Sequence, residues 1–157
     1  GGVAWRDVPP YILAQVGGAF AGVASAHVMF GEAIFSISTH ERAGGAQFFS
    51  EVVATFGLLA VIFGCARHRP RAIPVAVGAY ITAAYWFTSS TSFANPAVTL
   101  ARSVSNTFAG IRPVDVPAFV VAQCVGATLA TLAFRWLAPK RVDDPRAAPL
   151  SSTEELP

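Results

Sequence analysis

The feature that most constrains this chain is a polar stretch, residues 89–102, that lies between two apolar segments and is interrupted by a proline. A run of hydroxyl residues ends there in Asn95-Pro96. Because the residue before a proline is kept out of the helical region, a helix can begin here only at the proline, with Asn95 as its N-cap. Helical spacing then predicts a helix over 96–107, about 18 Å long. That is about half of a bilayer's hydrocarbon core.

A half-helix inside a membrane is tolerated only where its unpaired backbone is buried in protein or faces a water-filled path. As N-cap, Asn95 would accept an N–H from Ala97 or Val98, which leaves its amide NH2 free to donate to a solute oxygen. The positive end of the helix dipole would disfavour cations there. The alternative is an ordinary loop before a short helix of a soluble protein, since Asn-Pro is a common turn signal.

Composition favours the membrane alternative. Of 157 residues, 54% are hydrophobic and 13% are charged, and the mean hydropathy is +0.52. These values exceed what a soluble domain of this size normally carries. The net charge is only +2, and the basic residues fall in short loops and the tail, so we expect no nucleic-acid partner. No nucleophile with a base, metal-ligand cluster or phosphate-binding loop is present in the sequence, so we expect neither an enzyme nor a metal or other cofactor.

Four apolar segments predict an all-α membrane protein, with spans at about 9–30, 47–66, 72–89 and 115–137. Basic residues cluster at 67–71 and 135–146, and the positive-inside rule makes both clusters cytoplasmic. The transmembrane domain is expected to cover 1–138. The remaining residues, 139–157, are rich in Pro, Ser, Asp and Glu and are expected to form a disordered cytoplasmic tail.

Few polar side chains lie inside these segments. Glu51 is the only carboxylate within an apolar stretch, and an intramembrane acid needs a partner. It could be a proton or ion site, or a structural residue that accepts hydrogen bonds from a buried loop; without a second membrane acid, the structural role is favoured. His27 is expected to be a hydrogen-bonded residue near the interface and His40 to be solvated. Cys65 and Cys124 are expected to pack as small hydrophobic residues.

The first and last spans form an internal repeat. Residues 8–19 (VPPYILAQVGGA) align with residues 116–127 (VPAFVVAQCVGA), sharing Ala-Gln and Gly-Ala at the same spacing. The predicted topology makes the two spans run in opposite directions, which is an inverted-topology repeat. The spans that should precede the first copy would lie before Gly1, so we expect the chain to be part of something longer.

Together, Asn95-Pro96-Ala97 on a re-entrant half-helix, Glu51 in the run EVVATF and the paired Ala-Gln spans resemble the aquaporin, or major intrinsic protein, family over residues 3–138. The resemblance implies a homotetramer with one pore per subunit, built from six spans and two Asn-Pro-Ala half-helices. This chain is similar to spans three to six with the second half-helix only, so the first part of the repeat is missing. The resemblance makes Asn95 and its neighbours Pro96 and Ala97 pore residues, and Glu51 the acid that steadies the carbonyls of loop 89–94.

The departures from the family pattern concern the pore filter. Water channels of the family place an arginine directly after the second Asn-Pro-Ala, where it narrows the filter and repels cations; this chain has Val98. Arg102, four residues later, is expected to extend to the membrane interface. Tyr85 is expected where water channels present a filter histidine, and Ser92 is expected to offer a backbone carbonyl.

A valine in the filter widens it and makes one wall apolar, which suits a neutral, hydroxyl-rich solute larger than water. We therefore expect a passive channel of the inner (plasma) membrane for small neutral solutes: arsenite or a similar metalloid hydroxide first, then glycerol, then water. The alternatives are a water-selective channel, an ion-coupled secondary transporter that uses Glu51, and a non-conducting fragment.

Overall fold

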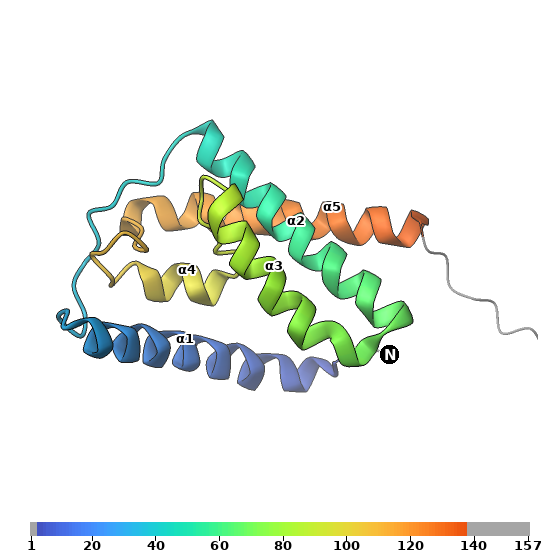
Figure 1. Ribbon diagram of the computed structural model, residues 1–157, viewed down its shortest axis with the longest axis horizontal. Coiled ribbons are helices and arrows are strands. Elements are labelled where there is room, and N and C mark those ends of the chain that lie inside the picture. Colours follow the sequence, from blue (N-terminus) through green and yellow to red (C-terminus); the bar gives the residue numbers. More distant parts are fainter. Residues whose placement is uncertain (1–2, 138–157) are drawn as a thin grey trace, which may run out of the picture.

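The computed structural model describes residues 3–137, and within them every regular element is helical (Figure 1). Three short 3₁₀ turns join or precede the long helices: η1 (Trp5–Asp7), η2 (Pro70–Ala72) and η3 (Pro113–Asp115). The α-helices are α1 (Val8–Phe30), α2 (Gly45–His68), α3 (Ile73–Phe87), α4 (Pro96–Arg102) and α5 (Val116–Leu137). The all-helical membrane fold predicted from the sequence is confirmed.

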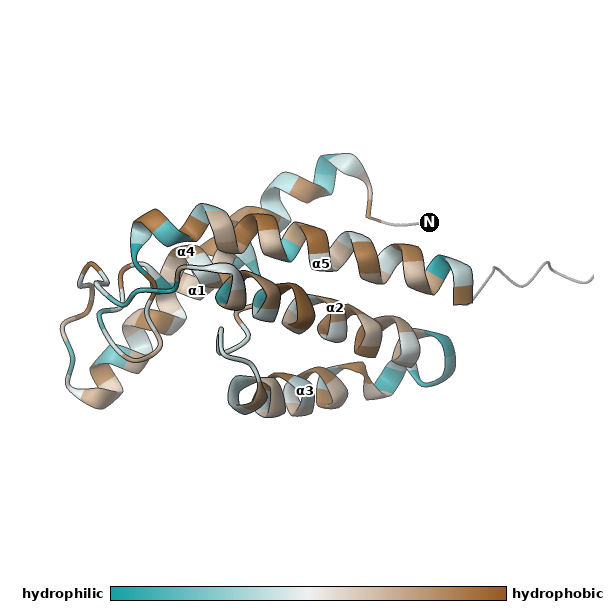
Figure 2. Ribbon diagram, turned by 90° about the horizontal axis from the view of Figure 1, so that it is seen from above, coloured by the Kyte–Doolittle hydropathy of each residue, from teal (hydrophilic) through white to brown (hydrophobic). Residues whose placement is uncertain are grey.

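Within residues 3–137, three segments are long and apolar enough to cross a bilayer: Trp5–Phe30, Gly45–His68 and Pro113–Leu137. Figure 2 shows the apolar colouring along these helices and the polar colouring in the connecting segments. The third predicted span, 72–89, is shorter than expected, because α3 has 15 residues and ends at Phe87. Thr88 is extended, and its hydroxyl donates to the Ala84 carbonyl, so Ser89 and Ser90 do not lengthen the helix.

The half-helix is also shorter than the predicted 96–107, because α4 ends at Arg102 after seven residues. Polar side chains beyond it make contacts that compete with a continued helix. The Ser105 hydroxyl pairs with the His27 ring, and the Asn106 side-chain oxygen accepts from Thr39. The Ser103 N–H donates to the Leu100 carbonyl at 3.1 Å, which closes the last turn in the tighter 3₁₀ manner.

The helices are arranged around the short α4. In Figure 1, α5 lies along α2, α3 packs on α2, and α4 lies between α1 and α5. A small apolar cluster joins the loop before α4 to the start of α5; its residues are Phe93, Ile111, Val116 and Phe119. At the crossing of α2 and α5, Gly126 lies directly against the Val52 carbonyl, so that even a methyl group there would clash.

The internal repeat extends to local structure. Val8 begins α1 directly after a 3₁₀ turn, and Val116 begins α5 directly after another. The two copies differ in their surroundings. Gln123 of α5 is 2% exposed, whereas the equivalent Gln15 of α1 is exposed. The predicted tail, 139–157, and the predicted domain end at 138 lie outside the described residues.

Candidate pore site

The segment that leads into α4 has an unusual backbone. Thr91, Ser92 and Ala94 have φ values of 56°, 49° and 49°, in the left-handed region that non-glycine residues seldom adopt. Such residues cluster at functional sites, where the surrounding structure holds them. Among residues 3–137, no donor reaches the carbonyl oxygens of residues 91–94. Buried carbonyls need a partner, so this row is available to water or to a solute.

Glu51 of α2 holds one end of this loop. Its side chain is fully buried, and its Oε1 accepts hydrogen bonds from the Ala94 N–H and from the Gln123 amide, the latter at 2.8 Å. Gln123 also donates to the Thr99 hydroxyl at 2.8 Å. A carboxylate and a carbonyl oxygen are both hydrogen-bond acceptors, so Glu51 cannot bind the carbonyls of residues 91–94 directly. It positions this carbonyl row through the Ala94 N–H. The second oxygen, Oε2, finds no partner in the described part of the chain.

Arg42, from the loop between α1 and α2, holds the other end of the segment that leads into α4. Its guanidinium is buried and donates to three carbonyl oxygens: Ser90 at 2.9 Å, Phe108 at 3.0 Å and Gly110 at 2.7 Å. Burial lowers the pKa of Arg42, and the positive charge of Arg102 lowers it further. Arginine stays protonated in proteins even so, and the planar fork of donors suits several carbonyls at once. Sequence analysis assigned Arg42 no role.

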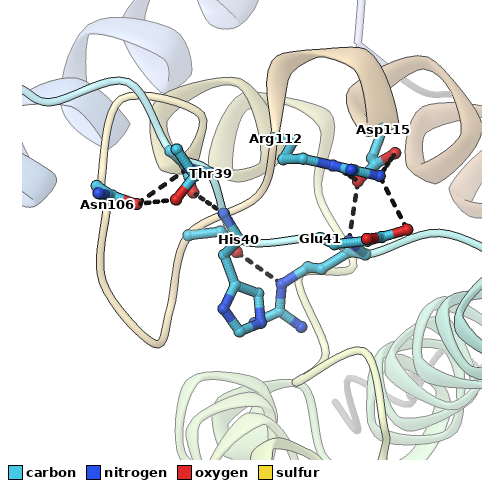
Figure 3. Close-up of polar contacts among 9 residues, drawn as sticks. Thr39, His40, Glu41, Asn106, Arg112 and Asp115 are labelled. Atoms are coloured by element: carbon cyan, nitrogen blue, oxygen red, sulfur yellow. Dashed lines mark hydrogen bonds and ion pairs between the residues drawn. The ribbon is translucent and has the colours of Figure 1, made fainter.

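The loop that carries Arg42 is attached to the segment after α4 (Figure 3). The Thr39 N–H and hydroxyl both donate to the Asn106 side-chain oxygen at 3.0 Å. Arg112 pairs with Asp115 at 3.0 Å and with Glu41 at 3.2 Å, and the Arg42 N–H donates to Asp115 at 2.9 Å. These contacts fix the position of Arg42 above the carbonyl row.

The amino end of α4 has the predicted cap. The Asn95 side-chain oxygen accepts the Ala97 N–H at 2.8 Å, and Pro96 is the first helical residue. The Asn95 side-chain nitrogen makes no hydrogen bond to any residue in the described range, so its two N–H groups are available. Val98 and Arg102 follow Asn95 at i+3 and i+7, a spacing that places all three on one face of the helix.

That face borders a cavity of about 590 Å³ between α1 and α4. Val98 and Arg102 line it from α4, and small residues of α1 line the opposite wall: Ala19, Gly22 and Ala26. His27 of α1 also lines it and is buried, with Nδ1 facing the Ile34 carbonyl at 2.8 Å and Nε2 facing the Ser105 hydroxyl at 2.7 Å.

Arg102 does not extend to the membrane interface, so that expectation was wrong. Its guanidinium carbon lies 4.7 Å from the Phe93 ring centroid and 5.9 Å from that of Tyr85, and Nη1 donates to the Ala109 carbonyl at 3.1 Å. Aromatic faces attract a guanidinium, and these partners inside the bundle hold it there. The side chain therefore points into the protein.

The remaining expected residues lie nearby. Tyr85 is half-buried on α3, and its ring packs edge-on against Phe108 at 6.1 Å. Ser92 is buried in the carbonyl row, and its hydroxyl has no partner among the residues that the structure describes. His40 is exposed, as expected. The site thus joins Asn95, Val98 and Ser92 with Arg102 and Tyr85.

Comparison with known proteins identifies the family. The family model described as "Major intrinsic protein" matches residues 66–154. The chain is 56% identical over 132 residues to aquaglyceroporin AqpS of Rhizobium meliloti (strain 1021), an alignment that covers 84% of this chain and 57% of that protein. No solved structure matches. With its long apolar helices, the chain is an integral membrane protein. It belongs to the major intrinsic protein family.

Proposed function

We propose that the protein is a passive channel for small neutral solutes, with trihydroxy acids such as arsenite and polyols such as glycerol favoured over water. The observation that carries the proposal is Val98, an uncharged residue on the cavity face of α4 next to Asn95. The similar protein from Rhizobium meliloti is named an aquaglyceroporin, which supports a solute larger than water.

In this mechanism, a solute hydroxyl exchanges its water for protein oxygens and N–H groups. The free carbonyls of residues 91–94, Ser92 among them, accept from the solute, and the Asn95 side-chain amide donates to it. Val98 contacts the apolar backbone of the solute, and Tyr85, which lies beside Arg102, forms a separate part of the pore wall. Glu51 keeps the carbonyl row in place, and none of these residues takes part in a reaction.

Flux into proteoliposomes tests this proposal, with the protein expressed from its own gene. The wild type should admit glycerol and arsenite faster than empty liposomes. Val98→Arg should lower both fluxes about tenfold or more while water flux falls less, because a charged, bulky side chain narrows the pore. Val98→Ala is the control for size without charge and should retain solute flux. A wild type that raises water flux alone would disprove the solute channel and leave a water-selective one.

We further propose that the protein resides in the plasma membrane as a homotetramer, with residues 1–138 as its membrane domain and the carboxyl terminus in the cytoplasm. The basic clusters at 67–71 and 135–146 support this orientation. Native mass spectrometry of the detergent-solubilised protein would give the number of subunits. Protease cleavage of the tail in inside-out vesicles, but not in right-side-out vesicles, would establish the orientation.

A further inference from the structure

We propose that Arg102 supplies the positive charge of this pore, and that it determines specificity by excluding cations while neutral solutes pass. The inference rests on the proposed channel function. It separates two properties that a single arginine directly after Asn-Pro-Ala would combine: Val98 sets the width of the pore, and Arg102 sets its charge.

The first argument is position. Asn95, Val98 and Arg102 share one face of α4, and Val98 and Arg102 line the same cavity. Arg102 follows Val98 by four residues, so its Cα lies about 6 Å further along the helix axis, and its guanidinium reaches the Phe93 ring. A solute that moves along this face therefore passes Asn95, Val98 and Arg102.

The second argument is that the charge of Arg102 is not neutralised. The ion pairs in which both partners are described residues are Arg6–Asp7, Arg112–Glu41 and Arg112–Asp115, and none includes Arg102. Glu32 also lines the cavity but is exposed and forms no ion pair with Arg102. The guanidinium contacts two aromatic rings and the Ala109 carbonyl, none of which carries a compensating charge, and the buried Glu51 acts on it only from a distance.

A second guanidinium, that of Arg42, adds to the positive electrostatic potential around Arg102. Arg42 lies 4.9 Å from the centroid of the Phe93 ring, and Arg102 lies 4.7 Å from the same centroid. Arg42 is committed to three carbonyls, whereas Arg102 makes one hydrogen bond to a carbonyl and borders the cavity. A guanidinium has five N–H donors, so Arg102 has donors to offer a solute oxygen. A neutral hydroxyl compound can accept from it, and a cation is repelled.

The experiment measures cation leak and solute flux in the same proteoliposomes. We compare the wild type with Arg102→Gln, which removes the charge but keeps a donor for the Ala109 carbonyl, and with Arg102→Lys, which keeps the charge. Arg6→Gln, at an exposed position outside the pore, is the matched control. Arg102→Gln should raise the ratio of sodium leak, read with a potential-sensitive dye, to glycerol flux about tenfold or more. Arg102→Lys and Arg6→Gln should leave the leak at the wild-type level.

A cysteine variant tests the same charge after folding. Arg102→Cys is made in a background with Cys65→Ala and Cys124→Ala, because both native thiols are free. A positively charged methanethiosulfonate reagent should lower the sodium leak of this variant to the wild-type level, and a negatively charged reagent should not.

Three outcomes would overturn the proposal: no leak in Arg102→Gln while glycerol flux persists, no effect of reagent charge on the cysteine variant, or membrane insertion of Arg102→Lys alone among the Arg102 variants. The last would mean that the charge is needed for folding rather than for selection. A wild type without solute flux would disprove the proposed function, yet the sodium leak of the variants would still report on Arg102.

Discussion

At the scale of single residues, Glu51 holds the segment that leads into α4 through the Ala94 N–H. One of its oxygens accepts two hydrogen bonds, from the Ala94 N–H and from Gln123, and the other has no partner among the described residues. A glutamine could therefore keep both contacts through its single carbonyl oxygen. A residue without an acceptor would leave both donors buried and unpaired.

We expect Glu51→Gln to keep most of the solute flux and Glu51→Leu to lose it. The leucine variant should also lose about 2–6 kcal/mol of stability, at about 1–3 kcal/mol for each buried donor left unpaired. Solute flux and thermal unfolding in detergent measure the two effects. If Glu51→Gln abolished flux while its unfolding temperature stayed at the wild-type value, a titrating role would replace the structural one.

At the scale of elements, the crossing of α2 and α5 depends on Gly126. A Cβ built there would lie too close to the Val52 carbonyl and to the Phe56 N–H nitrogen, which are backbone atoms that cannot rotate away. Small residues let membrane helices approach closely, and the contacts of Glu51 with Gln123 require this approach.

Gly126→Ala should therefore destabilise the protein by roughly 1–3 kcal/mol, even though alanine is the better helix former. Gly64→Ala, in α2, is the matched control, because a Cβ there meets nothing within 4 Å. It should be neutral or slightly stabilising. Unfolding temperatures in one detergent compare the two, and equal values would show that the crossing can relax.

The starts of the helices could be predicted from the sequence, whereas the end of α4 could not. Helix starts are set by local chemistry: Asn95-Pro96 fixes the start of α4, and prolines at the second positions of α1 and α5 mark theirs. Helix ends depend on distant partners. α4 stops at Arg102 because residues beyond it bind His27 and Thr39, which lie more than sixty residues away along the chain.

The side chains that sequence analysis missed share this property. Arg42 bonds to carbonyls 48 to 68 residues away, and backbone carbonyls leave no mark in a sequence. The location of the Arg102 side chain was predicted wrongly because no local sequence signal shows that its guanidinium packs against Phe93 and Tyr85. Its i+7 spacing from Asn95, on the face that carries Val98, was the available signal.

At the scale of the whole molecule, the described charges support the proposed passive movement over coupled transport. Among the described residues, Glu51 is the one buried carboxylate of an α-helix, and its contacts are an amide N–H and the Gln123 side chain rather than a charged group. A coupling site would need a partner with which to exchange charge.

We therefore expect glycerol to equalise across the liposome membrane and to accumulate no further, with the same rate in both directions. A proton gradient, or its removal by a protonophore, should leave the rate unchanged. Isotope uptake with and without an imposed gradient measures this. Accumulation against a concentration difference would point to a coupled transporter, and its loss in Glu51→Gln would identify the coupling group.

The left-handed residues before α4 bear on the conformational entropy that solute binding would cost in the proposed channel. Thr91, Ser92 and Ala94 hold a conformation that a free chain would rarely visit, with Glu51 and Arg42 fixing the two ends of their segment. The ordering of this backbone is completed once, when the protein folds. In the proposed channel, each solute molecule would therefore find its oxygen ligands already assembled, and its passage would not require the loop to be rebuilt.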